Sequence, residues 1–185
     1  YRGYISDWSG FEKIIELYEQ KDPEKRLFAF EVTMQNHGGY SHNDPDFNIY
    51  LHLTDQKEKT TSVMATEKYL TLMNLSDQAL EMMVEYFRDV DEPVIILMMG
   101  DHQPSDYITN VVRRITQNAE DGTLEDMQTG YQVPFVIWSN YGLEHAFYDK
   151  ISVNYLEGLL LEAGTEVKIT GYDLKKGIYT TLAAD

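Results

Sequence analysis

The chain has 185 residues, of which 43% are hydrophobic and 25% are charged, a composition that fits one globular domain with its own core. Its net charge is −16, so the average electrostatic field repels a polyanion, and we expect no nucleic-acid partner. The absence of cysteine excludes disulfides and thiolate chemistry, and the absence of a run of ~18 apolar residues predicts a soluble segment without a transmembrane helix.

The first elements are a helix and a strand. Ser9 and Glu12 have the spacing of a capping box, and apolar residues follow at helical intervals, which predicts a helix over residues 10–20. The stretch Leu27–Met34, LFAFEVTM, is almost continuously apolar and rich in aromatic and β-branched residues. This pattern predicts a strand that is buried on both faces.

The rest of the chain alternates between turn-rich segments, helical periodicity and short apolar runs. We predict turns over 35–46, a polar loop over 44–62, one long helix or two short ones over 62–90, and a strand over Val94–Met99. We further predict a helix over 106–118, an acidic loop over 119–130, a strand over Val133–Trp138 and a helix over Ser152–Ala163, and we leave the tail from Thr165 unassigned. Strands that alternate with helices predict an α/β fold with a mostly parallel sheet flanked by helices, formed by residues 1–185 as one domain.

Polar motifs follow the first two predicted strands. The first strand runs into Asn36-His37-Gly38-Gly39 and the second into Gly100-Asp101-His102-Gln103, whereas Ser139-Asn140-Tyr141 after the third strand is a weaker signal. Ligands of open parallel sheets bind beyond the carboxyl ends of the strands. We therefore expect the first two motifs to face one cleft.

Asp101 and His102 are candidate metal ligands. Adjacent strand residues point to opposite faces, so the pair can share an ion only if the chain bends, which Gly100 permits. A carboxylate with an imidazole suits manganese or zinc better than calcium, and further ligands must come from elsewhere. In the alternative interpretation, Asp101 only caps the next turn and His102 donates to a backbone carbonyl.

His37 is the candidate catalytic residue. The glycines after it let a ligand approach the backbone closely, although a plain turn histidine has the same sequence pattern. We expect the other three histidines to lie on the surface, and neither Ser105 nor Thr33 has a nucleophile elbow around it. The surface histidines are His42, His52 and His145.

At these motifs the chain resembles the lipoteichoic acid synthase-like sulfatases of the alkaline phosphatase superfamily. The matching pieces are FAFEVTMQNHGGY, MMGDHQPS, VPFVIWSNYGLE, ISVNYLEGLLLEAG and YISDWSGFEKIIELYEQK, so the similarity covers nearly the whole chain.

The resemblance implies a membrane-anchored enzyme with an extracellular catalytic domain, which acts on phosphoglycerol groups or on related phosphate or sulfate esters. A threonine nucleophile and one divalent metal, typically manganese with zinc or magnesium as alternatives, carry out the chemistry of such enzymes. Asp101 and His102 are then metal ligands, and His37 is the residue at the substrate phosphate or the leaving oxygen.

The chain departs from that family in one respect that matters. No part of it resembles the half that carries the nucleophile, so we interpret residues 1–185 as the C-terminal part of a catalytic domain whose partner is the missing N-terminal half, and expect the isolated chain to be inactive. Gly39 stands where many relatives have proline. The alternatives are a phosphoethanolamine transferase, another phosphodiesterase of the superfamily, or a non-catalytic α/β module.

Overall fold

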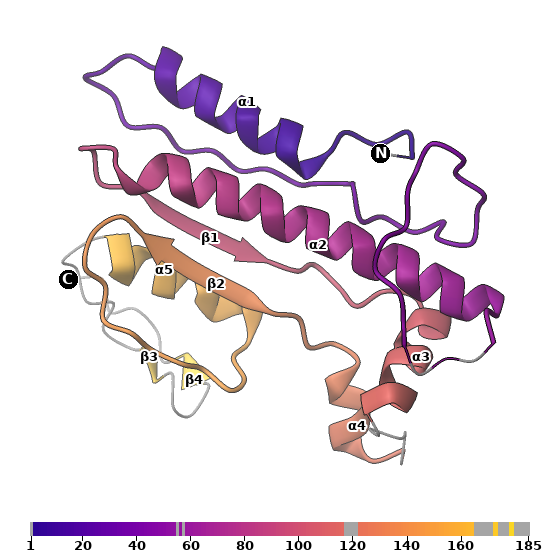
Figure 1. Cartoon of the computed structure of the whole chain (residues 1–185). Coiled ribbons are helices and arrows are strands. Elements are labelled where there is room, and N and C mark those ends of the chain that lie inside the picture. Colours follow the sequence, from indigo (N-terminus) through magenta and orange to yellow (C-terminus); the bar gives the residue numbers. More distant parts are fainter. Residues whose placement is uncertain are drawn as a thin grey trace.

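The computed structural model describes residues 2–54, 56, 58–116, 122–164, 172–173 and 178–179 (Figure 1). Its elements are, in chain order, α1 (Asp7–Gln20), α2 (Thr61–Arg88), β1 (Ile95–Met99), α3 (Asp106–Thr116), α4 (Leu124–Thr129), β2 (Phe135–Ser139), a 3₁₀ turn (Val153–Tyr155), α5 (Leu156–Gly164), β3 (Tyr172–Asp173) and β4 (Ile178–Tyr179). Among the described residues, no helix is long and apolar enough to cross a membrane.

The two long helices form at the predicted places. α2 is a single helix of 28 residues, and the side chain of Thr60 caps it by accepting from the backbone N–H of Val63. α1 begins earlier than predicted, because Ser6 is its N-cap and accepts from the N–H of Ser9 at 3.1 Å. The predicted capping box is therefore wrong: Ser9 lies inside the helix.

The main core lies between α1, α2 and the small sheet. Phe11 of α1 packs against Ala79, Met83 and Phe87 of α2, and all four are buried. Ile96 of β1 and Trp138 of β2 cover the other side of this cluster. An apolar stripe on each helix thus decides how the two helices lie side by side, as the helical periodicity predicted.

The predicted parallel sheet is wrong. β1 and β2 pair antiparallel, from Ile95 opposite Ser139 to Met99 opposite Phe135, and β3 with β4 is a second antiparallel pair. The reason lies in the connection, because α3 packs on α2 beyond the end of the sheet and does not cross over it. The chain then returns alongside β1, where Gly100 N–H donates to the carbonyl of Pro134 at 3.1 Å.

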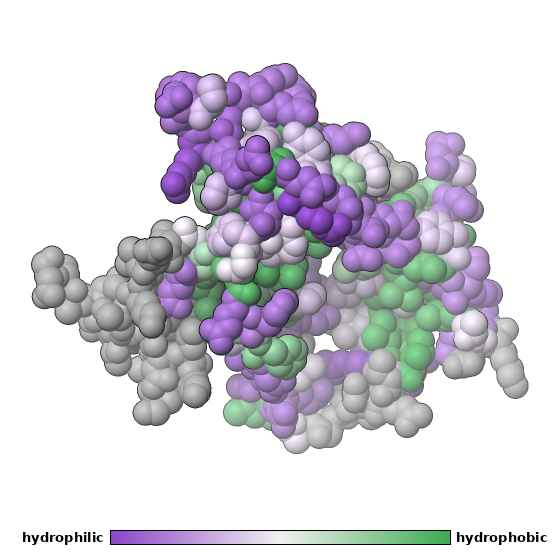
Figure 2. Space-filling view, turned by 60° about the vertical axis from the view of Figure 1, so that its left-hand side comes forward, coloured by the Kyte–Doolittle hydropathy of each residue, from purple (hydrophilic) through white to green (hydrophobic). Residues whose placement is uncertain are grey.

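The predicted strand Leu27–Met34 is also not observed as a strand. The segment passes α1 in an extended conformation, and within the described part of the chain no backbone hydrogen bond joins residues 27–33 to a neighbour. Its alternate side chains Phe28, Phe30 and Val32 are 82%, 82% and 69% exposed. The predicted burial fails because a strand needs a neighbouring backbone and a covering layer, and the described residues supply neither. Figure 2 shows apolar side chains at the surface, as green patches among hydrophilic residues.

The region between the two strands contains one helix that was not expected. We predicted an acidic loop over 119–130, but α4 occupies Leu124–Thr129. Thr123 caps it by accepting from the N–H of Asp126. The acidic residues of its first turn also stabilise it, because their negative charges lie at the positive end of the helix dipole. The predicted helix over 106–118 agrees with α3 as far as Thr116. Residues 117–118 and most of the tail lie outside the described residues.

A buried polar network joins α1 and α2 to the chain just before His37. Asp7, Gln35 and Ser76 are 2%, 1% and 2% exposed. The Gln35 side chain accepts from the N–H of Asp7 at 3.1 Å and donates to Ser76 Oγ at 3.1 Å, and Ser76 Oγ donates to Asp7 Oδ2. Burial raises the pKa of Asp7, although the Ser76 hydrogen bond opposes this shift. The network fixes the point where the extended segment becomes the His37 loop.

We predict that Ser76→Ala lowers the free energy of unfolding by about 1–3 kcal/mol, because it removes the hydroxyl that donates to the buried Asp7 carboxylate. Urea denaturation of the two proteins measures the difference. The matched control is Ser152→Ala, since Ser152 is exposed and its side chain makes no capping hydrogen bond. Equal losses in the two variants would show that the network does not stabilise the fold.

Candidate functional site

The His37 loop, residues 35–44, follows the extended segment and is held in a tight turn. The N–H of His37 donates to the carbonyl of Met34 at 3.0 Å, and the N–H of His42 donates to that of Gly39 at 3.0 Å. Gly39 has φ +95°, a left-handed conformation that glycine adopts readily. Proline has φ near −65° and cannot replace it in this conformation, so the loop differs from one with proline at that position. The His37 side chain is exposed.

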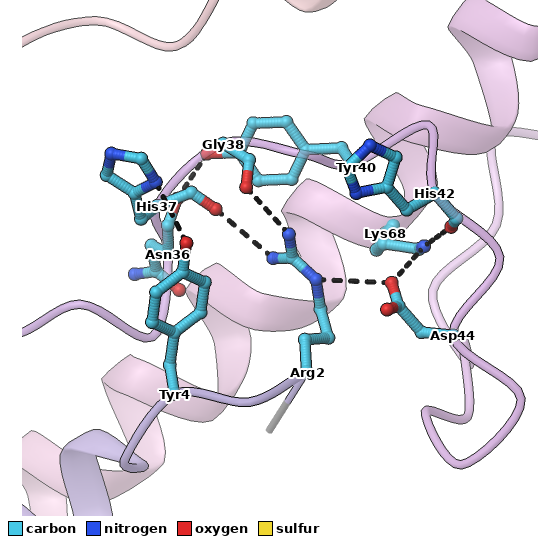
Figure 3. Close-up of polar contacts among 9 residues, drawn as sticks. All are labelled: Arg2, Tyr4, Asn36, His37, Gly38, Tyr40, His42, Asp44 and Lys68. Carbon is cyan, nitrogen blue, oxygen red and sulfur yellow. Dashed lines mark hydrogen bonds and ion pairs between the residues drawn. The ribbon is translucent and has the colours of Figure 1, made fainter.

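Arg2 holds the loop from below (Figure 3). Its guanidinium donates to the carbonyls of His37 and Gly38 at 3.3 and 2.9 Å, and its Nε donates to Asp44 Oδ2 at 3.3 Å. The guanidinium carbon lies 5.2 Å from the centroid of the Tyr40 ring, a cation–π contact. The Arg2 side chain is 3% exposed. Its guanidinium therefore binds groups inside the loop and does not face the solvent.

Asp44 and Lys68 close the other end of the loop. Lys68 Nζ donates to Asp44 Oδ2 at 2.7 Å and to the carbonyl of His42 at 2.5 Å. The hydrogen bond from Lys68, helped by the charges of Lys68 and Arg2, holds the pKa of Asp44 below its usual value. Because Lys68 belongs to α2, this ion pair fastens the loop to the long helix.

Tyr40 connects the His37 loop to α3, the helix that follows Asp101 and His102 in the chain. It packs in a buried cluster with Ile108 of that helix. Its hydroxyl donates to the carbonyl of Asn36, and burial raises its pKa to about 12. Tyr40 is therefore neutral at physiological pH.

Asp101 and His102 form an exposed pair directly after β1. Their side chains are 81% and 74% exposed, and Asp101 Oδ2 lies 3.3 Å from His102 Nε2. Asp101 Oδ1 accepts from the N–H of His102 at 2.8 Å, and His102 Nδ1 lies 2.8 Å from the carbonyl of Gln103. Both contacts of the alternative interpretation are thus present, but they leave Asp101 Oδ2 and His102 Nε2 facing each other.

This geometry fits two ligands of one metal ion. Donation from Nδ1–H to the Gln103 carbonyl leaves a lone pair on Nε2, the arrangement that metal-bound histidines commonly use. Metal–ligand bonds of about 2.0–2.2 Å at tetrahedral angles separate two ligand atoms by about 3.3–3.5 Å, close to the observed 3.3 Å. Among the described residues, no group of three or more metal-ligating side chains occurs, so Asp101 and His102 would need further ligands to hold an ion tightly.

We predicted that Gly100 is needed for its backbone freedom at a bend, and this reason is wrong. Gly100 does not adopt a left-handed backbone conformation. A Cβ at this position would lie 3.0 Å from Cβ of Val133. Glycine therefore favours the close packing of the chain after β1 against the returning segment, where Asp101 follows.

The remaining histidines lie on the surface as predicted, since His42, His52 and His145 are all exposed. His52 Nδ1 also lies 3.2 Å from Glu67 Oε2, in a cluster with Lys59. Burial raises the pKa of Glu67, but hydrogen bonds from Lys59, from the N–H of Leu53 and from His52 outweigh this effect. The pKa of Glu67 therefore lies below its usual value. Sequence reasoning missed Arg2, Asp44 and Lys68, because no spacing in the sequence relates them to His37.

The chain belongs to the sulfatase family, whose model matches residues 1–157. This family has an alkaline phosphatase-like α/β fold, of which the described residues form a mostly helical part with small antiparallel sheets.

One relative is a putative cyclic beta-1,2-glucan modification protein of Rhizobium meliloti (strain 1021), which is 32% identical over 142 residues. The match covers 74% of this chain and 21% of that protein, so the chain spans about a fifth of its relative's length. No solved structure matches the chain significantly.

We predict that Gly39→Ala lowers the free energy of unfolding by about 1–2 kcal/mol, since alanine is strained at φ +95° and its Cβ would meet His42 at 3.2 Å and Arg2 at 3.3 Å. Chemical denaturation measures the loss. Gly38→Ala is the matched control, because a Cβ there meets nothing within 4 Å and Gly38 does not adopt the left-handed conformation. A similar cost at both positions would contradict the importance of the turn at Gly39.

We predict weak Mn²⁺ binding by the isolated chain, with a Kd on the order of 1 mM, because two ligands provide too few bonds for a tight site. The loss of the free-Mn²⁺ electron paramagnetic resonance signal measures binding. Asp101→Ala should abolish it, whereas Asp77→Ala, which removes an exposed carboxylate of α2, should not. Binding that persists in Asp101→Ala would place the ion elsewhere.

Proposed function

We propose that this chain is the metal- and substrate-binding part of a metal-dependent phosphoglycerol transferase or sulfatase-like hydrolase that acts on phosphate or sulfate esters. The observation that carries the proposal is the pair of facing ligand atoms at Asp101 and His102. The His37 loop packs, through Tyr40, against the helix that follows this pair in the chain. Membership of the sulfatase family supports the enzyme class.

Each candidate residue has one role in this proposal. Asp101 and His102 contribute two ligands to a divalent metal, manganese first and zinc or magnesium as alternatives. When bound, such an ion neutralises charge on a phosphoryl group. The exposed imidazole of His37 lies on the loop that Arg2 holds, where its Nε2–H donates a hydrogen bond to the phosphoryl or leaving oxygen and stabilises the charge that develops there.

The partner of the chain in this proposal is the part of its own polypeptide that supplies the nucleophile. The exposed segment Leu27–Met34 supports it, because an extended apolar segment with unpaired backbone groups is a template for a neighbouring strand. A second copy of the chain is a poor occupant, since each copy carries a net charge of −16. Sheet pairing at this segment also buries Phe28 and Phe30.

The substrate class follows from the family and from the name of the relative. We propose a lipid or polymer that carries phosphoglycerol as the donor, at the extracellular face of the cell membrane. The name of the relative favours a glucan as the molecule that is modified. Phosphoethanolamine transfer and phosphodiester hydrolysis use the same metal and histidine chemistry, whereas a non-catalytic module needs neither.

We predict that Asp101→Ala and His37→Ala, made in the complete polypeptide that carries this chain, each lower phosphoglycerol transfer or ester hydrolysis by about 10²-fold or more. A radiolabelled phosphoglycerol lipid with a β-glucan acceptor measures transfer, and a chromogenic phosphodiester and sulfate ester measure hydrolysis. His145→Ala is the control, because this histidine is exposed and distant in sequence from both motifs. Full activity of Asp101→Ala would overturn the proposal, as would turnover by the isolated chain.

A further inference from the structure

We infer that the segment Arg2–Tyr4 positions the His37 side chain: Arg2 fixes its backbone, and Tyr4 selects the imidazole tautomer that carries its hydrogen on Nε2. The inference rests on the proposed function for its consequence, because that tautomer presents a donor to a phosphoryl or sulfuryl oxygen. Its geometric content stands on the contacts of this segment alone.

Tyr4 contacts the imidazole directly. Its hydroxyl oxygen lies 3.2 Å from Nδ1 of His37, and the two rings have centroids 5.7 Å apart with an interplanar angle of 56° (Figure 3). Among the described residues, no other ring stacks on His37. The orientation of the imidazole therefore depends on Tyr4 together with the loop backbone.

The direction of this hydrogen bond follows from the chemistry of the two groups. A phenolic O–H is a better donor than the N–H of a neutral imidazole, and an imine nitrogen is a better acceptor than a phenolic oxygen. Tyr4 therefore donates, and Nδ1 of His37 accepts. The hydrogen of the neutral ring is then on Nε2, at the opposite side of the ring from Tyr4.

Arg2 fixes the backbone on which this ring is mounted. Its guanidinium donates to the carbonyls of His37 and Gly38. The peptide groups on both sides of the Gly38 Cα therefore cannot rotate without breaking a hydrogen bond. Arg2 and Gly3 have φ 55° and 84°, two successive left-handed residues that turn the chain under the loop. This turn places the Arg2 fork and the Tyr4 hydroxyl on the same loop.

The test uses Tyr4→Phe in the 185-residue chain labelled with nitrogen-15 histidine. Long-range proton–nitrogen spectra at a pH where His37 is neutral distinguish the two tautomers by the shifts of Nδ1 and Nε2. The unmodified chain should show His37 predominantly as the Nε2–H tautomer, and Tyr4→Phe should shift it to a mixture. The control is Tyr50→Phe, since the Tyr50 hydroxyl also bonds a side chain, that of Asn74, on an exposed surface.

Arg2→Lys separates the backbone role from the tautomer role. It keeps the positive charge but loses the planar fork, so the Gly38 and Gly39 amide signals should move or broaden while the Tyr4 hydrogen bond retains part of the tautomer preference. An unchanged tautomer in Tyr4→Phe, or the same change in Tyr50→Phe, overturns the inference. Unchanged loop amide signals in Arg2→Lys overturn the role of Arg2.

A kinetic measurement on the complete polypeptide gives the functional consequence. Tyr4→Phe should lower kcat about fivefold with little change in KM, the effect of one hydrogen bond that matters in the transition state. A changed tautomer with no detectable turnover in the unmodified enzyme would leave the positioning role intact and reject the proposed function. A changed tautomer with unaltered kcat would reject Tyr4 as a positioning residue for catalysis.

Discussion

The buried carboxylate of Asp7 is the constraint on which the arrangement of this chain depends. A carboxylate that is 2% exposed destabilises the fold unless a donor meets it. Ser76 on α2 donates to Oδ2 of Asp7, and Gln35 before the His37 loop accepts from the backbone N–H of Asp7 and donates to Ser76. These contacts form only when α1, α2 and the end of the extended segment are all in place. The apolar contacts of Phe11 with α2 supply the burial, and the polar network sets the register of that packing.

The candidate site follows from this arrangement and uses different kinds of support on its two sides. The His37 loop is fixed by charged groups, because the Arg2 fork binds its carbonyls and Lys68 binds Asp44. The Asp101–His102 turn is fixed by backbone packing, since Gly100 leaves room for Val133. Tyr40 packs with Ile108 of α3, so a neutral buried phenol connects the histidine loop to the helix that follows the exposed carboxylate–imidazole pair. Rigid loops that present exposed polar groups are typical of sites that position a ligand.

Local sequence patterns predicted the helices well because helical periodicity reports the packing of one face, and Phe11, Met83 and Phe87 all lie where that periodicity places them. They failed for the sheet. The pattern of Leu27–Met34 identifies a segment suited to a two-sided burial, but the neighbours that bury it are not among the described residues. The antiparallel pairing of β1 with β2 depends on where α3 packs, which is a tertiary choice that no short pattern encodes. The position of His37 and of Asp101–His102 after apolar runs was visible in the sequence, whereas Arg2 and Lys68 act across long separations and left no local signal.

The central claim is that the His37 loop and the Asp101–His102 pair face one site. Paramagnetic relaxation by Mn²⁺ tests it most directly, because an ion held at Asp101 and His102 broadens nearby nuclei with a steep dependence on distance. We predict that substoichiometric Mn²⁺ broadens the imidazole signals of His37 as well as those of His102, that His145 stays sharp, and that Asp101→Ala removes the effect on His37. Strong broadening of His102 with an unaffected His37 would contradict a shared site.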